Sequence, residues 1–267
     1  MPSSGSAMLQ IRGLSVRHDT PGGAVTALTG VDLDVHAGEC LGIVGESGSG
    51  KTQLLLSILG LLPPQAHIAG SIRYQSTELI GMPASALNRI RGARIAMIFQ
   101  DPMTALNPYL RVLEQLSEVA RLHDGLSRRA AEERALGMIE AVHIGEPARR
   151  ARQYPHELSG GMRQRIMVAM VLMAEPQIIL ADEPTTALDV TVQAQVLALL
   201  QEVRERTGAA MVLVTHDLGV VAQLADRIGV MRAGAIVELA GCEQLFATPR
   251  HPYTQQLLRA LPSLDAP

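Results

Sequence analysis

The stretch from Gly45 to Thr52 has the residue types and the spacing needed to bind phosphate. It reads Gly-Glu-Ser-Gly-Ser-Gly-Lys-Thr and fits the pattern G-x-x-x-x-G-K-[ST]. Its glycines let the backbone curl so that successive amide groups point inward, and a helix start after the loop adds partial positive charge. In such a loop Lys51 reaches the terminal phosphates of a nucleotide, and Thr52 a magnesium ion. We therefore expect a nucleotide site; the alternative is an ordinary glycine-rich turn into a helix.

A second group of chemical residues follows an apolar run at Ile178 to Ala181, which ends in the carboxylates Asp182 and Glu183. Carboxylates at the end of a strand lie at the crevice where open α/β sheets bind ligands. Asp182 would then hold magnesium, and Glu183 would orient an attacking water. The alternative is a polar turn that caps the next helix, but the phosphate loop upstream favours the first interpretation.

Three further positions carry candidate chemistry. Ser159, before Gly160 and Gly161, is a good helix N-cap, and the two glycines expose backbone donors suited to an anion. Gln100 follows an apolar run, and His216 follows another. Each also has a simpler interpretation, as an ordinary helix cap, a turn residue or a residue that precedes a cap.

The elements that position these residues indicate an α/β fold. The phosphate loop lies between an apolar strand pattern at 41–44 and a helical pattern at 53–61. Alternating patterns predict half-buried antiparallel strands before it, and the pattern from Leu110 to Met173 is helical. From Ile178 onward strands and helices alternate, as in a parallel sheet with crossover helices. The individual predictions are strands at 9–16, 31–35, 70–74, 94–99, 178–181 and 211–215, a turn at 21–23, and helices at 190–206 and 218–225.

Composition excludes several classes of protein. The 267 residues are 47% hydrophobic, enough for a large core in one domain or two closely packed ones. A net charge of −3 and 2% aromatic residues argue against nucleic-acid binding. The longest apolar run, Ile166 to Ala174, is too short to span a membrane, and the first eight residues do not form a secretory signal. Cys40 and Cys242 are expected to be unpaired thiols, and the scattered histidines predict no structural zinc.

Taken in order, these motifs resemble those of ATP-binding-cassette (ABC) ATPases, over essentially the whole chain. The resemblance implies a P-loop NTPase (RecA-like) α/β core with an antiparallel β subdomain and an inserted α-helical subdomain. It implies that Thr186 to Asp189 form the D-loop, that Glu183, His216 and Gln100 are catalytic, and that Thr52, Gln100 and Asp182 contact Mg²⁺. The implied ATP-contacting residues are Gly45, Glu46, Ser47, Gly48, Ser49, Gly50, Lys51, Thr52, Gln53, His18, Ser159, Gly160 and Gly161.

Three segments, at 100–108, 154–158 and 249–254, are similar to the ATP-binding subunits of oligopeptide, dipeptide and nickel importers. This resemblance implies a peripheral subunit at the cytoplasmic face of the inner membrane that hydrolyses ATP. Its implied partners are a second ABC ATPase subunit, two integral membrane permease subunits and an extracytoplasmic substrate-binding protein, and no nucleic acid. In such a pair Ser159 and Gly161 act on the nucleotide held by the partner.

Other functions stay open at this stage. Peptides are the first expectation for cargo, and nickel or a metal chelate is the second. A soluble ABC ATPase acting on DNA or ribosomes would carry long heptad arms or a duplicated cassette, neither of which the sequence has. A P-loop kinase or GTPase would leave Ser159 to Met162 and His216 unexplained.

Motif positions predict the domain boundaries and reveal departures from the family pattern. The expected segments are 8–100 (β subdomain and Walker A), 101–173 (helical), 174–245 (Walker B, D-loop and switch histidine) and 246–267 (tail).

His18 lies near the position where the family stacks an aromatic residue on adenine, and Met162 replaces a common glutamine. The sequence to Pro267 lacks the tail cysteines of some relatives, so no iron–sulfur cluster is expected.

Overall fold

The computed structural model describes residues 7–186 and 188–260. Its internal contacts divide the chain into two compact units. The first unit combines the residues up to Pro83 with those from Ala210 onward, and the second runs from Ala84 to Ala209. The domain boundaries expected from the motifs, at 100, 173 and 245, stay a prediction.

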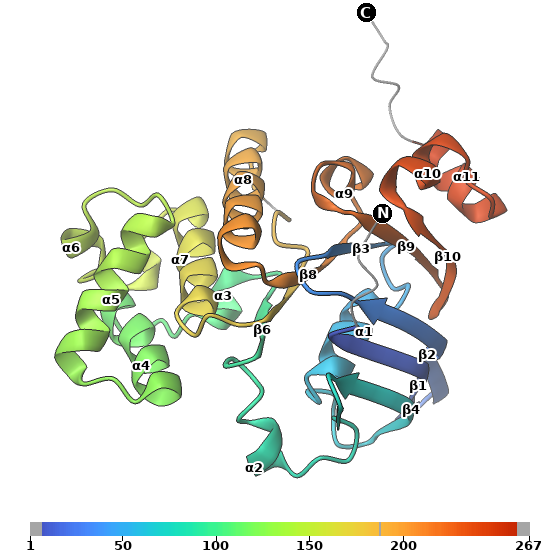
Figure 1. Ribbon diagram of the computed structural model, residues 1–267, viewed down its shortest axis with the longest axis horizontal. Helices are drawn as coiled ribbons and strands as arrows, with labels where there is room; N and C mark the ends of the chain where they lie inside the picture. Colours follow the sequence, from blue (N-terminus) through green and yellow to red (C-terminus); the bar gives the residue numbers. More distant parts are fainter. Residues whose placement is uncertain (1–6, 187, 261–267) are drawn as a thin grey trace, which may run out of the picture. The chain divides into compact units, whose positions relative to one another are not determined.

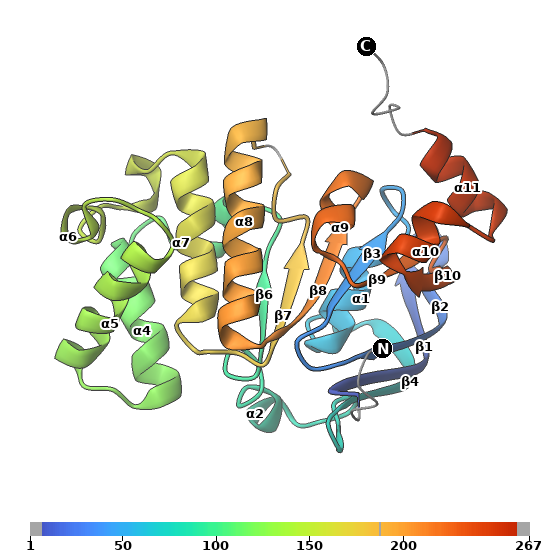
Figure 2. The same ribbon diagram turned by 45° about the horizontal axis from the view of Figure 1, so that its top comes forward.

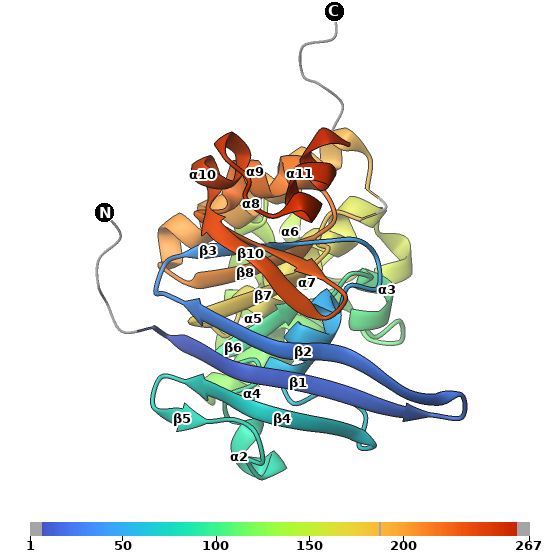
Figure 3. The ribbon, with the colours of Figure 1, turned by 90° about the vertical axis from the view of Figure 1, so that its right-hand side faces the viewer.

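The first unit begins with an antiparallel sheet, which Figure 3 shows along the lower part of the view. Its order is β2-β1-β4-β5. The strands are β1 (Leu9–Thr20), β2 (Gly23–Val35), β4 (Ala66–Tyr74) and β5 (Thr77–Glu78). The predicted antiparallel strands are confirmed, but β1 and β2 extend to the tight turn between them. Sequence periodicity missed these extensions for two reasons. The halves of β1 and β2 nearest the turn are mostly exposed, and the pairing register between β1 and β2 shifts along β1.

The first unit also contains parallel strands, and these position the phosphate loop. Strand β3 (Cys40–Val44) lies between β8 (Ala210–Thr215) and β9 (Arg227–Arg232), parallel to both, and β10 (Ala235–Gly241) runs antiparallel to β9. Every residue of β3 and β8 is buried. The helices that follow β3 and β8 are α1 (Lys51–Ile58) and α9 (Leu218–Leu224). Helix α1 therefore begins two residues before the predicted helix at 53–61.

Two short helices end the described chain. They are α10 (Cys242–Ala247) and α11 (Pro252–Arg259), and Figure 2 shows them beside β10. Helix α11 begins with Pro252, whose fixed φ suits the first helical position. The side chain of His251 caps the helix by accepting a hydrogen bond from the amide of Tyr253 at 3.1 Å. The periodicity of the sequence did not reveal β9, β10 or these helices.

The second unit pairs two parallel strands with a group of helices. Strand β6 (Ile95–Ile98) pairs with β7 (Ile178–Asp182), with Ile98 opposite Ala181. Figure 1 shows helices α4, α5 and α7 grouped together. The helices are α2 (Ala84–Leu87), α3 (Pro102–Ala105), α4 (Val112–Asp124), α5 (Arg128–Ala141), α6 (Pro147–Arg150), α7 (Gly160–Leu172) and α8 (Val190–Thr207), with a 3₁₀ turn at Pro155–Glu157. The helical segment predicted between Leu110 and Met173 is confirmed.

Within residues 7–186 and 188–260, no helix combines the length and the apolar character needed to cross a bilayer. Cys40, which is buried, and Cys242, which is half-buried, form no disulfide within the described part of the chain. Burial and the nearby carboxylates of Glu243 and Asp226 raise the pKa of the Cys242 thiol, so it stays protonated at neutral pH.

Candidate functional site

The phosphate-binding pattern forms a loop that leads from β3 into α1, as the sequence predicts. A Cβ atom at Gly45 would lie 2.2 Å from the carbonyl oxygen of Met231, on the neighbouring strand β9. Gly50 precedes α1 with φ of 107°, a conformation that L side chains rarely adopt. The path of the backbone therefore requires glycine at both positions.

The loop offers groups that bind phosphate oxygens. Lys51 is the only lysine in the chain, and it is 5% exposed to solvent. Its Nζ donates hydrogen bonds to the carbonyl oxygens of Gly45 and Glu46, at 2.9 and 3.0 Å. Among the described residues, the buried hydroxyl of Ser49 has no hydrogen-bond partner. A cation and an unsatisfied hydroxyl in one loop are suited to an anionic ligand.

His216 lies at the same sheet edge as the loop. Val44 and Thr215 are opposite each other in the parallel β3–β8 pair, so Gly45 and His216 leave that pair together. His216 is exposed, and the next residue, Asp217, caps α9 by accepting a hydrogen bond from the amide of Gly219 at 2.8 Å. His216 thus precedes a helix cap and also lies at the sheet edge from which the phosphate loop emerges.

His18 and Gln53 are brought together within the first unit. His18 Nε2 lies 2.9 Å from Gln53 Oε1, and both side chains are half-buried. Gln53 directly follows Thr52 in the first turn of α1. The β1 residue is therefore held beside the helix that the phosphate loop begins, and stacking of its ring on adenine stays a prediction.

In the second unit Gln100 and Glu183 are hydrogen-bonded. Gln100 follows β6 and Glu183 follows β7, and these strands are parallel neighbours. Gln100 Nε2 donates to Glu183 Oε2 at 3.3 Å, and the hydroxyl of Thr186 donates to the same oxygen at 2.8 Å. Two neutral donors thus orient the carboxylate that the sequence singles out.

The two adjacent carboxyl residues differ in environment and in backbone conformation. Asp182 ends β7 and is 3% exposed, whereas Glu183 is half-buried. Glu183 has φ of 45°, in the left-handed region, which costs a non-glycine residue on the order of 1 kcal/mol. Strain of this kind is often found at functional sites, and the strained residue here is the one whose carboxylate accepts a hydrogen bond from Gln100.

The segment Ser159 to Gly161 begins helix α7. Ser159 Oγ accepts a hydrogen bond from the amide of Met162 at 3.3 Å, which confirms the predicted N-cap. Ser159 and Gly160 are exposed, and a Cβ atom at Gly160 would meet nothing within 4 Å. A Cβ atom at Gly161 would lie 2.7 Å from Cγ1 of Val192 on α8. The start of α7 is thus exposed on one side and closely packed on the other.

The sequence reasoning missed the role of Gln164. This residue is 1% exposed, and its Nε2 donates to the carbonyl oxygen of Pro184 at 2.6 Å. The bond ties the N-terminal part of α7 to the residue after Glu183. The only signal in the sequence was a glutamine next to an apolar run. Its neighbours Arg163 and Arg165 donate to the carbonyl oxygens of Pro155 and His143, so they also brace the second unit.

Gly161→Ala is expected to destabilise the protein because the added methyl group collides with Val192. Valine is stiff at χ1, so α7 or α8 must shift, and overpacking of this kind costs about 1–3 kcal/mol. Gly137→Ala is the matched control, because it makes the same change in helix α5 with nothing within 4 Å of the new Cβ atom. It is expected to stabilise by about 0.5–1 kcal/mol. Denaturant unfolding measures both; equal stability of the two variants would contradict the close contact.

The candidate residues fall into one set in each unit. The first unit contains His18, the loop with Gln53, and His216; the second contains Gln100, Asp182, Glu183 and the Ser159 segment.

Of the predicted D-loop, Ala187 lies outside the described residues. Asp189 caps α8 by accepting a hydrogen bond from the amide of Val192 at 3.0 Å. In the described parts of the chain, no group of three His, Cys, Asp or Glu side chains is arranged to hold a metal ion.

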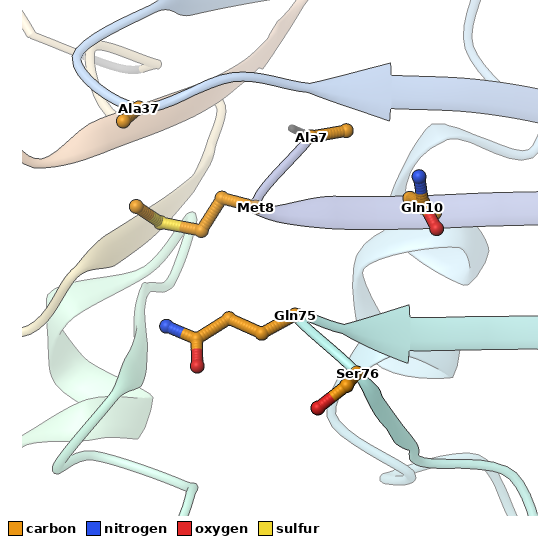
Figure 4. A pocket seen from close by; sticks show the side chains of 6 residues that line it. All are labelled: Ala7, Met8, Gln10, Ala37, Gln75 and Ser76. Atoms are coloured by element: carbon orange, nitrogen blue, oxygen red, sulfur yellow. The ribbon is translucent and has the colours of Figure 1, made fainter. Parts of the chain in front are cut away.

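Two pockets in the first unit lie away from these residues. Figure 4 shows the larger, of about 550 Å³, at the ends of β1 and β4. It is lined by Ala7, Met8, Gln10, Ala37, Gln75 and Ser76. The second, of about 350 Å³, lies on the antiparallel sheet and includes Arg17 and His67. Neither pocket is lined by a predicted site residue.

Comparisons with known proteins agree with the order of the motifs. A family profile described as ABC transporter matches residues 28–186, and one described as oligopeptide/dipeptide transporter, C-terminal region, matches residues 237–267. The chain is 48% identical to the oligopeptide transport ATP-binding protein OppD of Salmonella typhimurium, over 99% of this chain and 79% of that protein. It is 50% identical to the dipeptide transport ATP-binding protein DppD of Bacillus subtilis, over 97% of this chain and 78% of that protein.

Solved structures give the same result for the fold. The dimeric ATP-binding cassette MJ0796, in a post-hydrolysis state bound to ADP and phosphate, superposes with a TM-score of 0.79 at 30% identity. The match covers 88% of this chain and 99% of that one. The predicted α/β fold class, a P-loop NTPase core, is confirmed.

Proposed function

The chain belongs to the ABC transporter family of ATP-binding, ATP-hydrolysing proteins, and from this premise we propose that it powers a membrane importer of oligopeptides or dipeptides. The observation that carries the proposal is the second family match, over residues 237–267, to the C-terminal region of oligopeptide/dipeptide transporters. The relatives named for peptide transport, at 48% and 50% identity, support the same cargo class.

In this proposal the loop from Gly45 to Gln53 binds the phosphates of ATP. The buried hydroxyl of Ser49, which lacks a partner among the described residues, and the Lys51 ammonium fit oxygen acceptors. Lys51 exchanges its bonds to the carbonyl oxygens of Gly45 and Glu46 for bonds to phosphate. The backbone amides of Ser47, Gly48 and Gly50 complete the cradle, and His18 packs on the adenine with Gln53 beside it.

Magnesium would be held by oxygen ligands, which hard divalent cations prefer. The chain supplies these at Thr52, Gln100 and Asp182, from a hydroxyl, an amide and a carboxylate. When bound, Mg²⁺ would offset the negative charge of the phosphates. Asp182, at the buried end of β7, is fixed by its strand, and Thr52 is fixed by the first turn of α1.

Hydrolysis depends on the orientation of Glu183. Its carboxylate accepts hydrogen bonds from Gln100 and Thr186, which hold it in one position without neutralising its charge. In that position Glu183 polarises the attacking water, Gln100 senses the ion or the water, and His216 contacts the γ-phosphate. The chemistry is mainly positioning and charge stabilisation.

A second ATPase subunit completes each nucleotide site in this proposal. Ser159, Gly160 and Gly161 present an exposed helix start, where backbone amides attract anions. They act on the ATP held by the phosphate loop of the other subunit. The solved cassette that superposes on this chain is described as dimeric, which supports this arrangement.

Exposed apolar side chains after Gln100 are the proposed contact with two membrane permease subunits. Tyr109 is 87% exposed and Met103 is 45% exposed, so one short segment presents two large apolar side chains to a partner. The chain then lies at the cytoplasmic face of the membrane. An extracytoplasmic binding protein delivers the cargo to the complex.

Purification of the assembled transporter tests the proposal. The chain is expected to copurify with integral membrane subunits, and ATP hydrolysis by the reconstituted complex is expected to rise when its binding protein is loaded with oligopeptides or dipeptides. Stimulation by nickel or a nickel chelate, with none by peptides, would contradict the cargo class. Copurification with ribosomes or DNA in place of membrane subunits would contradict the transport role itself.

A further inference from the structure

Tyr253, in the C-terminal segment, contacts the phosphate loop. Tyr253 lies on α11 and is 4% exposed. Its hydroxyl oxygen accepts a hydrogen bond from the backbone amide of Glu46, the second residue of the loop, at 3.4 Å. The two residues are 207 positions apart in sequence, and both belong to the first unit.

Several contacts fix the position of Tyr253. The Arg232 guanidinium lies 4.7 Å from the centre of its ring, a favourable cation–π distance. His251 caps its helix, as described above. The carboxylate of Glu238 accepts hydrogen bonds from the amides of Arg250 and His251, at 2.8 and 2.9 Å, and so ties the start of α11 to β10.

The hydrogen-bonded amide belongs to the peptide unit whose carbonyl holds Lys51. The peptide group is planar, so the carbonyl of Gly45 and the N–H of Glu46 turn together. The carbonyl oxygen of Gly45 accepts a hydrogen bond from the Lys51 ammonium at 2.9 Å, and the N–H of Glu46 donates a hydrogen bond to the Tyr253 hydroxyl. The absence of a Cβ atom at Gly45 leaves this peptide against Met231. Tyr253 and Lys51 therefore hold the two sides of one peptide plane.

We propose that Tyr253 is a positioning residue for ATP binding. Its hydroxyl fixes the Gly45–Glu46 peptide, and this peptide in turn fixes where the Lys51 ammonium lies before ATP binds. The inference rests on the proposed role of the phosphate loop. Burial, together with the charge of Glu46, raises the pKa of Tyr253, so the hydroxyl stays neutral at physiological pH. The C-terminal segment that marks peptide transporters is thereby part of the support of the nucleotide site.

Tyr253→Phe tests the proposal because it removes the hydroxyl and keeps the ring over Arg232. The dissociation constant of Mg-ATP, measured by calorimetry on the full chain, is expected to rise about 2- to 5-fold, the effect of one weak neutral hydrogen bond. The Glu46 amide is expected to exchange its hydrogen faster, which a merely structural role at α11 would not produce. Tyr74→Phe removes the hydroxyl of another buried tyrosine, on β4. It is expected to change neither value.

The outcomes separate the inference from the proposed function. Unchanged ATP affinity and unchanged exchange at Glu46 in Tyr253→Phe would overturn the inference, while ATP binding by the wild type preserves the proposed function. If the wild type and Lys51→Ala bind ATP equally, the proposed function fails instead. Should Tyr253→Phe not fold, Glu238→Gln loosens the same segment and keeps the hydroxyl; faster exchange at Glu46 in that variant supports the inference, and unchanged exchange overturns it.

Discussion

Glu183→Gln is expected to slow ATP hydrolysis by about 10²- to 10⁴-fold, the loss typical of a general base, while ATP binding is retained. The amide keeps the shape of the side chain, and Gln100 and Thr186 still have an oxygen to which they can donate. It loses the negative charge that draws a proton from water. Turnover is measured in the complex with its membrane subunits, and ATP binding is measured by calorimetry.

Glu205→Gln provides the control for this change. Glu205 lies on the exposed side of α8, where it accepts a hydrogen bond from Gln201 at 3.0 Å, and it belongs to no predicted site. Its turnover is expected to equal that of the wild type. Near-normal hydrolysis by Glu183→Gln would remove Glu183 from the proposed mechanism, whatever the geometry around it.

Lys51→Ala is expected to weaken ATP binding about 100-fold, because a charge-assisted hydrogen bond contributes about 1.5–3 kcal/mol and the cation faces several phosphate oxygens. The substitution also takes the ammonium donor from the carbonyl oxygens of Gly45 and Glu46, so the loop loses an internal clamp. Calorimetric titration with Mg-ATP measures the affinity. Arg206→Ala, which removes an exposed cation from α8, is the control and should bind ATP as the wild type does. Equal affinities of the two variants would contradict the role of Lys51.

Local patterns were sufficient to predict the strand, the loop and the helix around Lys51. The residues from Leu41 to Ile58 combine a buried apolar run, required glycines and a helix start, all within one short segment. The pair Asp182 and Glu183 was predicted for a similar reason, because an apolar strand that ends in carboxylates is uncommon. Each of these predictions needs only contacts between near neighbours in the chain.

Features that depend on distant residues were not predictable from the sequence. The segment at 249–254 resembles that of peptide and nickel importers, but nothing in its sequence indicates that Tyr253 meets the amide of Glu46. The left-handed conformation of Glu183 depends on what surrounds it, since glutamate has no preference for that region. The bond from Gln164 to Pro184 was equally hidden, because a single glutamine before an apolar run has many possible partners.

The solitary lysine of the phosphate loop has a practical consequence. Apart from the α-amino group, Lys51 carries the only primary amine of the chain, since the sequence contains no other lysine. A reagent that acylates side-chain amines can therefore label the protein only inside the loop, where the ammonium is buried against two carbonyl oxygens. The number of acyl groups on lysine, counted apart from the α-amino group, then gives the number of accessible phosphate loops, so covalent labelling becomes a direct titration of the nucleotide site.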